Sequence, residues 1–205
     1  MRDVRIIPLT GLGLLKNNVY IVHRRDSDEA VLIDASKSQD KIIETLESNG
    51  LKLKAVLLTH GHYDHIYSAH IFEKSGAEIF IHEADRDKLH TSGNLCRVKI
   101  PDTVAEKIFR DGDVIEKCGL RFEVIHTPGH SAGSVSFRLG DVLFSGDTLF
   151  RDGYGRTDFY DGDFIQMISS VGKLLELPPD IAVYPGHGPF TTIEHERQSN
   201  PLILK

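Results

Sequence analysis

The sequence predicts an α/β fold of four layers, in which two sheets pack face to face and helices cover their outer surfaces. Three observations favour this arrangement. Up to about residue 90, short apolar runs alternate with helical patterns. The rest of the chain is again rich in strand patterns, which then pass into a helical pattern. The 205 residues contain no linker, low-complexity segment or short repeat, so residues 1–205 are expected to form one domain.

The first half of the chain is expected to alternate strands with helices. Its strand segments are short, apolar or rich in β-branched residues, and polar turns separate them. A helix is expected after Ser36–Gln39, which has the spacing of a capping box, and Gly50 stands where this helix would end. The predicted strands are Val4–Leu9, Asn18–His23, Ala30–Asp34, Lys54–Leu58 and Glu78–Ile81, and two further helices are predicted over about His65–Lys74 and Glu83–His90.

The second half is expected to hold several strands and then a helix. A less regular stretch, about Thr91–Ile108, comes first. The predicted strands are Leu120–His126, Ser134–Leu139, Asp141–Phe144 and Ile181–Tyr184, and the predicted helix spans about Phe164–Leu177. Because both halves combine strands with helices in this way, two sheets with helices outside them account for the whole pattern.

Composition and charge limit the classes of function. The net charge of −6 and the pI near 6.0 provide no basic field for a polyanion, so we expect no nucleic-acid partner. No segment reaches the roughly 20 apolar residues of a spanning helix, and residues 1–10 lack the features of a secretory signal. Cys96 and Cys118 have no metal-ligand spacing and suit a reducing compartment. We therefore expect a cytoplasmic protein with no membrane partner, either a monomer or a small homo-oligomer.

A cluster of metal-ligand residues follows the fourth predicted strand. His60 and His62 stand two residues apart, and in an extended loop such side chains project to the same side, where both can reach one cation. Asp64 and His65 follow at once, and a turn after Tyr63 would direct them to a second cation nearby. Core packing gives no reason for so many imidazoles and a carboxylate in six residues. The run therefore predicts a metal site in preference to ordinary core or surface histidines.

Three later fragments each place a possible ligand directly after a glycine at the end of an apolar strand. The ligands are His130, Asp147 and His187. Glycine lets the chain bend sharply at such a point and direct the next side chain into a shared cleft. Each fragment alone is also compatible with a simple turn, but all three add to the case made by the first cluster.

Together these fragments resemble the metallo-β-lactamase superfamily, whose pattern is HxHxDH followed by a distal His, a bridging Asp and a last His. The resemblance covers essentially the whole chain, and its HxHxDH part is highly specific. Within the superfamily the chain is similar to small proteins related to glyoxalase II, the hydroxyacylglutathione hydrolases. This likeness rests on Gly146–Phe150, Gly155–Asp158, Gly186–Pro189 and Asn200–Pro201. The resemblance implies a four-layer αββα sandwich with two mixed sheets.

The resemblance also implies two divalent metal ions. By position, one ion would be held by His60, His62 and His130, the other by Asp64, His65 and His187, and Asp147 would bridge them. Asp64 and Asp147 would thereby be catalytic carboxylates as well as ligands. Zinc is the expected metal, and such mixed sites also accept iron or manganese.

Asp34 is a candidate for orienting one of these ligands. It ends a predicted strand and is the kind of acid that accepts the second N–H of a metal-bound imidazole. The alternative is a turn residue with no link to the site. The remaining histidines have no ligand partner at a suitable spacing and are expected to be structural or solvated: His23, His70, His82, His90, His126 and His195.

The resemblance implies hydrolysis of a thioester such as S-lactoylglutathione by a metal-bound hydroxide. Neither cysteine lies in a nucleophile motif, and a metal-bound hydroxide needs no separate Ser or Cys nucleophile. Arg156 matches a position where glyoxalase II proteins carry a basic residue that binds glutathione, but Asp158 stands where those proteins tend to carry tyrosine. Arg156 is therefore expected either to bind the thiol part of the substrate or to pair with Asp158 and hold the loop. No C-terminal helical substrate domain is expected beyond His187.

A second reaction class fits the same pattern. Persulfide dioxygenases share this fold and a similar Gly-Arg-Thr-Asp-Phe stretch, present here as Gly155–Phe159. The resemblance to them would imply one iron, held by His60, His130 and Asp147. Oxygen uptake with glutathione persulfide distinguishes this alternative from thioester hydrolysis.

Overall fold

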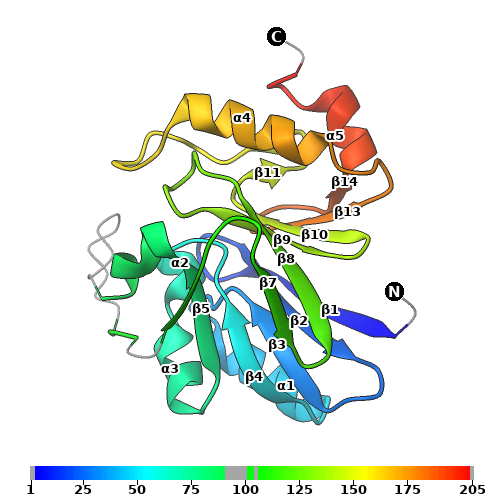
Figure 1. The fold of residues 1–205 in the computed structure, drawn as a ribbon. Coiled ribbons are helices and arrows are strands. Elements are labelled where there is room, and N and C mark those ends of the chain that lie inside the picture. The colour runs from blue at the N-terminus through cyan, green and yellow to red at the C-terminus, as the bar shows by residue number, and fades with distance from the viewer. Residues whose placement is uncertain (1–2, 91–100, 104–105, 204–205) are drawn as a thin grey trace.

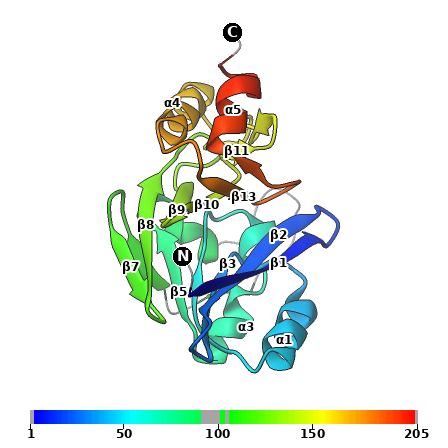
Figure 2. The same cartoon turned by 90° about the vertical axis from the view of Figure 1, so that its right-hand side faces the viewer.

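The computed structural model describes residues 3–90, 101–103 and 106–203. Two six-stranded sheets pack face to face, with α1, α2 and α3 covering one outer surface and α4 and α5 covering the other (Figure 1). A view from the side shows the same four layers, with α1 and α3 at one end of the stack and α4 and α5 at the other (Figure 2). The predicted four-layer αββα sandwich is therefore confirmed.

The first sheet contains the strands of the N-terminal half in chain order. Its strands are β1 (Val4–Leu12), β2 (Asn17–Arg24), β3 (Glu29–Ile33), β4 (Lys52–Leu57), β5 (Glu78–His82) and β6 (Glu106–Phe109). β1 to β3 pair antiparallel, whereas β3 to β6 pair parallel. The parallel strands need crossover connections, and α1 (Gln39–Ser48), α2 (Tyr63–Ile66) and α3 (Ala69–Lys74) lie in those connections.

The second sheet contains the strands of the C-terminal half. Its strands, in spatial order, are β14 (Thr191–Thr192), β13 (Ala182–Pro185), β10 (Val142–Gly146), β9 (Val135–Leu139), β8 (Leu120–His126) and β7 (Val114–Lys117). β13 pairs parallel with β10 after the crossover through α4 (Phe164–Leu175), and the other neighbours are antiparallel. β11 (Leu149–Phe150) and β12 (Gly153–Tyr154) form a small ribbon, and α5 (Ile193–Ser199) closes the chain beside α4.

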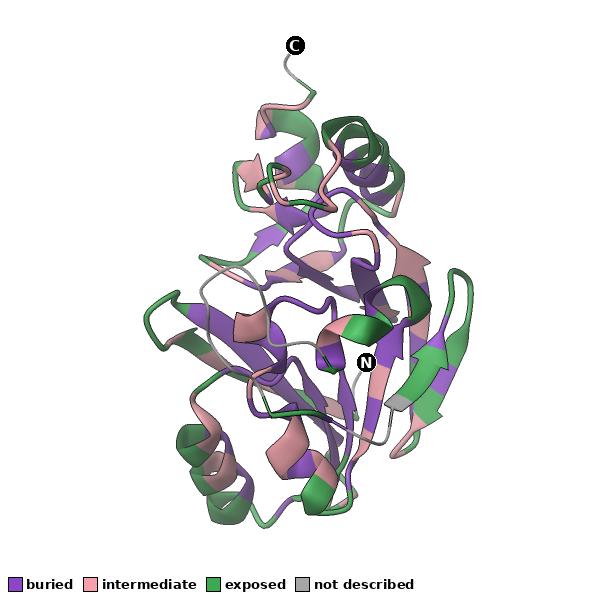
Figure 3. Cartoon of the chain, turned by 90° about the vertical axis from the view of Figure 1, so that its left-hand side faces the viewer, coloured by how far each residue is buried: buried purple, intermediate pink, exposed green. Residues whose placement is uncertain are grey.

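Three apolar clusters fill the spaces between the four layers. Along β2, Val19 and Ile21 point to the cluster under α1 and α3, whereas Tyr20 and Val22 point to the cluster between the sheets. A third cluster, which includes Leu143 and Val171, lies between the second sheet and α4. The central strands are therefore buried on both faces, and the outer faces of the helices are exposed (Figure 3).

Several expected elements differ from the structure. The capping box is wrong: α1 starts at Gln39 with Ser38 as its N-cap, and no side chain caps it. The backbone carbonyl of Ser36 accepts a hydrogen bond from the Ser68 hydroxyl, outside the helix. The helix expected over His65–Lys74 is two helices, since the N–H of Ala35 donates to the carbonyl of His65 and interrupts the ladder. The helix at Glu83–Leu89 is a 3₁₀-helix.

The stretch about Thr91–Ile108 is more regular than expected at its end, where β6 begins at Glu106. Residues 91–100, with Cys96, lie outside the described residues. Cys118 is a free, half-buried thiol. Within the described part of the chain, no helix has both the length and the apolar character needed to cross a membrane.

Candidate metal centre

The HxHxDH segment forms the loop between β4 and α2 and the first turn of that helix. His60 and His62 lie in the loop, where the chain is extended at His62. Asp64 and His65 lie on α2, whose start at Tyr63 provides the expected turn. His130, Asp147 and His187 come from three loops that follow β8, β10 and β13 of the other sheet. The site therefore lies where loop ends from both sheets meet.

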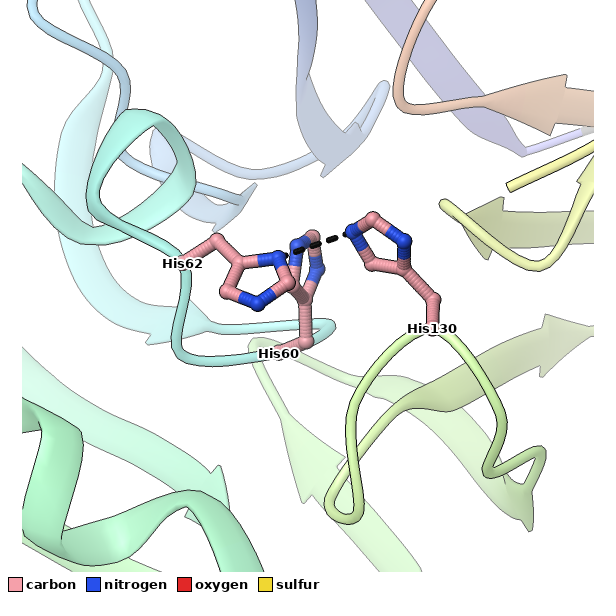
Figure 4. A group of neighbouring side chains, drawn as sticks. All are labelled: His60, His62 and His130. Atoms are coloured by element: carbon pink, nitrogen blue, oxygen red, sulfur yellow. Dashed lines mark hydrogen bonds between the residues drawn. The ribbon is translucent and has the colours of Figure 1, made fainter. Parts of the chain in front are cut away.

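The first group of possible ligands, the three-histidine set, is His60, His62 and His130. One nitrogen from each lies within 4.8 Å of the others, and all three side chains are buried. Nδ1 of His62 and Nε2 of His130 are 2.8 Å apart, and the three rings converge from two separate loops (Figure 4). As predicted, the i and i+2 imidazoles point to the same place, and the more distant histidine joins them.

The second group, the mixed set, is Asp64, His65 and His187. Its ligand atoms also lie within 4.8 Å of one another. Nε2 of His65 is 3.3 Å from Nε2 of His187, and Oδ2 of Asp64 is 3.5 Å from each of these nitrogens. The structure thus brings these six residues together in two groups, and a further group of His60, His65 and Asp147 joins them.

Asp147 lies between the two sets. Its Oδ2 is 3.5 Å from Nε2 of His130 and 3.4 Å from Nε2 of His187, and its Oδ1 is 3.5 Å from Nε2 of His65. Gly186 is required beside it, because a Cβ at that position would collide with the carboxylate. One carboxylate therefore faces ligands of both sets, which is the position of a bridge.

The buried polar atoms fit a cation. Nε2 of His60 and Oδ1 of Asp147 have almost no solvent contact and no hydrogen-bond partner among the described residues. Leaving such atoms without a partner costs about 1–3 kcal/mol each. Imidazole nitrogens and carboxylate oxygens are together suited to zinc, iron or manganese. The His/Asp cluster is therefore compatible with divalent metal binding.

Electrostatics favour neutral imidazoles in the three-histidine set. Burial lowers the pKa of His60 well below its usual range, and the neighbouring histidines add to the effect. Burial and the nearby His130 lower the pKa of His62 to about 3. The pKa of His130 is also lowered, chiefly by burial. Neutral imidazole is the form that binds a metal.

In the mixed set the surrounding carboxylates favour protonated imidazoles. Burial lowers the pKa of His65, but the carboxylates around it, led by Asp147, more than offset this and raise it to about 9. Hydrogen bonds to Asp147 and Asp64 likewise outweigh burial and raise the pKa of His187 to about 11. Burial raises the pKa of Asp147, yet His65 and His187 hold it at about 2. The pKa of Asp64 is lowered for the same reason.

Asp34 lies behind both sets. Its Oδ2 accepts a hydrogen bond from Nδ1 of His65 at 2.8 Å and from the Thr59 hydroxyl at 2.9 Å. That hydroxyl is in turn 3.1 Å from Nδ1 of His60. Asp34 itself adopts a φ of +63°, which the backbone of an aspartate tolerates better than most. The structure thus places it in contact with a possible ligand of the mixed set, as the orienting role requires, and one hydroxyl away from the other set.

Another buried carboxylate behind the ligands, Asp85, was not predicted from the sequence pattern. Its Oδ2 accepts hydrogen bonds from the N–H of Gly61 and the hydroxyl of Ser131, both at 2.7 Å. Its Oδ1 accepts from the N–H of Gly133 at 2.9 Å and forms an ion pair with Lys88 at 2.9 Å. Asp85 therefore ties together the two loops that carry the three-histidine set.

Three further contacts at the ligands were also missed. Nδ1 of His130 donates to the carbonyl of Arg156, and Nδ1 of His187 donates to the carbonyl of Leu15, at 2.8 and 2.9 Å. Nδ2 of Asn17 donates to Oδ2 of Asp64 at 2.8 Å. A backbone carbonyl carries no sequence signal, so only the fold identifies the first two partners.

A pocket of about 490 Å³ opens over the two sets. Possible ligands of both sets form its base, and Leu15, Tyr63, Phe150 and Phe159 supply most of its walls. Arg156 also lines it, but the guanidinium forms a two-pronged ion pair with Asp158, with both distances at 2.6 Å. Its charge centre also lies 4.6 Å from the ring centre of Phe159. Of the two roles expected for Arg156, pairing with Asp158 is the one seen in this structure.

One of the remaining histidines, His195, lies in another group of potential ligands with Asp152 and Glu196. Its Nε2 is 2.6 Å from Oδ1 of Asp152. The carboxylate of Glu196 already accepts hydrogen bonds from Thr191 and Asn200. The contacts of this group are therefore those of an internal hydrogen-bond network, and the structural role expected for His195 suits them.

Comparison with known proteins identifies the family. The model of the metallo-beta-lactamase superfamily matches residues 12–187. An uncharacterized protein of Mycobacterium tuberculosis is 38% identical over 93% of this chain and 94% of its own length. The hydroxyacylglutathione hydrolase GloC of Haemophilus influenzae is 36% identical over 98% of both chains. The chain therefore belongs to the metallo-β-lactamase superfamily.

Several solved structures share this fold. The B3 metallo-beta-lactamase BLEG-1 is 33% identical, with a TM-score of 0.91 over 98% of this chain and all of its own. TTHA1623, solved in a di-iron-bound form, is 34% identical with a TM-score of 0.82 over 95% and 98%. ETHE1 from Myxococcus xanthus is 31% identical with a TM-score of 0.81 over 98% and 85%. The fold and the hydrolase-like superfamily are thus shared with these neighbours, one of which was solved with two irons bound.

Proposed function

We propose that this protein is a dinuclear metal-dependent hydrolase that cleaves thioesters of the hydroxyacylglutathione type. The observation that carries the proposal is the position of Asp147, whose carboxylate faces both ligand sets at the base of a largely apolar pocket. The 36% identity with a hydroxyacylglutathione hydrolase over 98% of both chains supports the choice of substrate.

In this proposal the three-histidine set would hold one ion and the mixed set the other, with the Asp147 carboxylate available to both. Zinc is the proposed metal, with iron or manganese as alternatives, since the di-iron neighbour shows that a related chain accepts iron. Two such ions, when bound, polarise a carbonyl oxygen and lower the pKa of bound water to about 7.

The chain's own residues have three tasks. Asp34 and the carbonyls of Leu15 and Arg156 fix the ligand imidazoles through their second nitrogens. Asp64, held ionised and oriented by Asn17, supplies negative charge at the base of the pocket. The rings of Phe150 and Phe159 and the side chain of Leu15 exclude water around the acyl group.

The pocket contains no serine or cysteine nucleophile among the described residues that line it. Cys118 lies outside the pocket, and burial raises the pKa of its thiol. The sequence has one GxSxG match, Gly129–Gly133, but its Ser131 is buried outside the pocket lining and its hydroxyl donates to Asp85. This agrees with attack by water.

The test is metal analysis of the purified protein together with turnover of S-lactoylglutathione. We expect two metal ions per chain, thiol release without oxygen uptake, and loss of activity on treatment with a chelator. A β-lactam and a lactone panel serve as competing substrates, because a neighbour of the same fold is a β-lactamase. Faster turnover of either of these than of every thioester tested would overturn the proposal.

A mononuclear iron persulfide dioxygenase is the second candidate, and the likeness to ETHE1 favours it. His130 and Asp147, two of the three residues that would hold its iron, lie 3.5 Å apart, and His60 faces them in the same cluster. One iron per chain and oxygen consumption with glutathione persulfide would establish this function and exclude the first.

A further inference from the structure

A second hollow adjoins the metal pocket and differs from it in charge. It has a volume of about 260 Å³ and shares Leu15, Tyr63 and Asp64 with the metal pocket. The hairpin between β1 and β2 forms one wall, and Lys37 and Ser38 form part of the other. We call this hollow the side arm. A ligand whose reacting group lies over the mixed set can therefore extend past Leu15 into the side arm.

The hairpin wall of the side arm is apolar and open. Leu12, Leu14 and Leu15 line it, with Leu14 fully exposed and Leu15 47% exposed. Two neighbouring leucines so open to solvent at a loop tip are unusual for a surface that contacts nothing else. The contact between the carbonyl of Leu15 and Nδ1 of His187 keeps this tip beside the metal site.

Lys37 is the basic side chain of the side arm. Its Nζ lies 5.0 Å from the ring centre of Tyr67, and it forms no ion pair with any residue in the described ranges. Other exposed lysines nearby in sequence are paired: Lys41 with Glu44, and Lys52 with Asp28. The one acid in the wall, Asp64, belongs to the mixed set, where it accepts a hydrogen bond from Asn17 and lies 3.5 Å from His65. The ammonium of Lys37 is therefore available to an incoming anion.

Arg156, on the metal-pocket side, is less available. Both prongs of its guanidinium contact Asp158, and its face lies over Phe159. A substrate carboxylate at Arg156 would have to compete with a carboxylate that is already in the best geometry for an arginine. The side arm offers an anion a cation without that competition.

We propose that the side arm is a binding subsite for the thiol half of the substrate, with Lys37 as the specificity-determining residue that receives its carboxylate. This inference rests on the proposed function, because it assumes a thioester whose thiol carries an anionic, peptide-like extension. The leucines of the hairpin contact the non-polar part of that extension, and Lys37 contacts its charged end. The substrate class is accordingly an anionic thioester, and neutral thioesters bind only through the acyl half.

The test compares KM values for S-lactoylglutathione and for an uncharged aryl thioester in the metal-loaded enzyme. Lys37→Ala is expected to raise KM for the glutathione thioester about two- to fivefold more than for the aryl thioester, the range of an exposed ion pair. Lys37→Glu is expected to increase this ratio to about tenfold, because a like charge then faces the carboxylate. Lys37→Arg is expected to restore the wild-type ratio.

Lys41→Ala is the matched control, since Lys41 is an exposed lysine four residues further on that pairs with Glu44. It is expected to leave both KM values unchanged. Binding of S-methylglutathione, followed by calorimetry, gives a readout that needs no turnover, and Lys37→Glu is expected to weaken it by a similar factor.

Equal changes for both thioesters in the Lys37 variants, or an unchanged affinity for S-methylglutathione, would overturn the subsite while leaving the proposed function intact. A wild-type enzyme that cleaves no thioester would instead overturn the proposed function. In that event calorimetry alone decides whether the side arm binds the glutathione moiety, since affinity that depends on Lys37 supports it and affinity that does not depend on Lys37 overturns it.

Discussion

The two halves of the metal centre are built differently, although they share Asp147. The three-histidine set contains neutral, buried imidazoles whose pKa values are lowered by burial. The mixed set contains two imidazoles whose pKa values are raised by carboxylates. A cation entering the first half meets free lone pairs, whereas a cation entering the second half must displace protons.

The supports behind the two halves differ as well. The loops of the three-histidine set are tied by a single buried carboxylate, Asp85, which binds backbone N–H groups in both. The mixed set is supported one ligand at a time, by Asp34, Asn17 and the carbonyl of Leu15. We infer that metal binding in the three-histidine set depends on the conformation of its two loops. Metal binding in the mixed set depends on the orientation and protonation of each ligand side chain.

The largest effect is expected where the halves meet. Asp147→Ala removes the carboxylate that faces both sets, so we expect fewer than two metal ions per chain. Turnover should fall by about 10³-fold, which corresponds to the several kcal/mol that a polarising metal pair contributes. Elemental analysis and kinetics on S-lactoylglutathione measure the two effects. Asp141→Ala, at an exposed carboxylate in the turn between β9 and β10, is the control. An Asp147→Ala protein with full metal content and turnover would show that the two halves are not a unit.

Removing one ligand from each half tests whether the halves bind independently. His60→Ala should weaken the ion of the three-histidine set, and His187→Ala should weaken the ion of the mixed set, each by about 100-fold or more. Titration with a competing chelator should then show one strong site in each variant in place of two. If both variants lose both ions together, the division into two sets is wrong.

The support provided by Asp85 is expected to matter less than a ligand but more than a surface charge. Asp85→Asn leaves Lys88 without its buried partner and presents an amide to the N–H groups of Gly61 and Gly133. We expect metal affinity at the three-histidine set to fall by about 10- to 100-fold, with a smaller change at the mixed set.

The control for Asp85→Asn is Glu196→Gln, which alters another fully buried carboxylate that accepts several hydrogen bonds, none of them from a ligand or its loop glycine. Both variants are expected to lower the unfolding temperature, because each leaves buried donors poorly matched. Only Asp85→Asn should change metal binding selectively. A loss of affinity that is the same at both sets, or the same in both variants, would indicate general destabilisation.

The ligands of both sets could be predicted from the sequence, whereas only part of their supports could. The ligands themselves were predictable, because His60 and His62 repeat at the spacing of an extended loop and each later ligand follows a glycine. Asp34 was predictable as a candidate for orienting a ligand, since it is an acid at the end of a predicted strand. Asp85 was not, because it lies in a helical pattern where an acid is ordinary and its contacts are with distant backbone groups.

Most elements of the fold were predictable for similar reasons. The predictions failed where tertiary contacts override the local sequence pattern. β2 and β10 each contain a run of apolar residues that is buried on both faces, and such runs are easy to recognise in a sequence. The helix after His65 was expected to be continuous, but the N–H of Ala35 takes the carbonyl of His65 away from it. β6 was missed, because Glu106–Phe109 is a short edge strand with charged residues.

The smallest expected effect is the response of the two halves to pH, and it tests their electrostatic difference directly. At neutral pH the raised pKa values of His65 and His187, about 9 and about 11, mean that the metal-free mixed set carries protons. Its affinity should therefore rise with pH, by about threefold for each proton displaced over the half unit from about pH 7.0 to 7.5. The pKa of His62, about 3, leaves the three-histidine set neutral over that range, so its affinity should stay nearly constant.

Calorimetry in buffers of different ionisation enthalpy counts the protons released as each ion binds. We expect about one to two protons from the mixed set and close to none from the three-histidine set. His60→Ala and His187→Ala separate the two events, because each leaves one set complete. Equal proton release from both sets would mean that the carboxylates do not hold protons on His65 and His187. The electrostatic difference between the two sets would then be wrong, although their grouping in space would be unaffected.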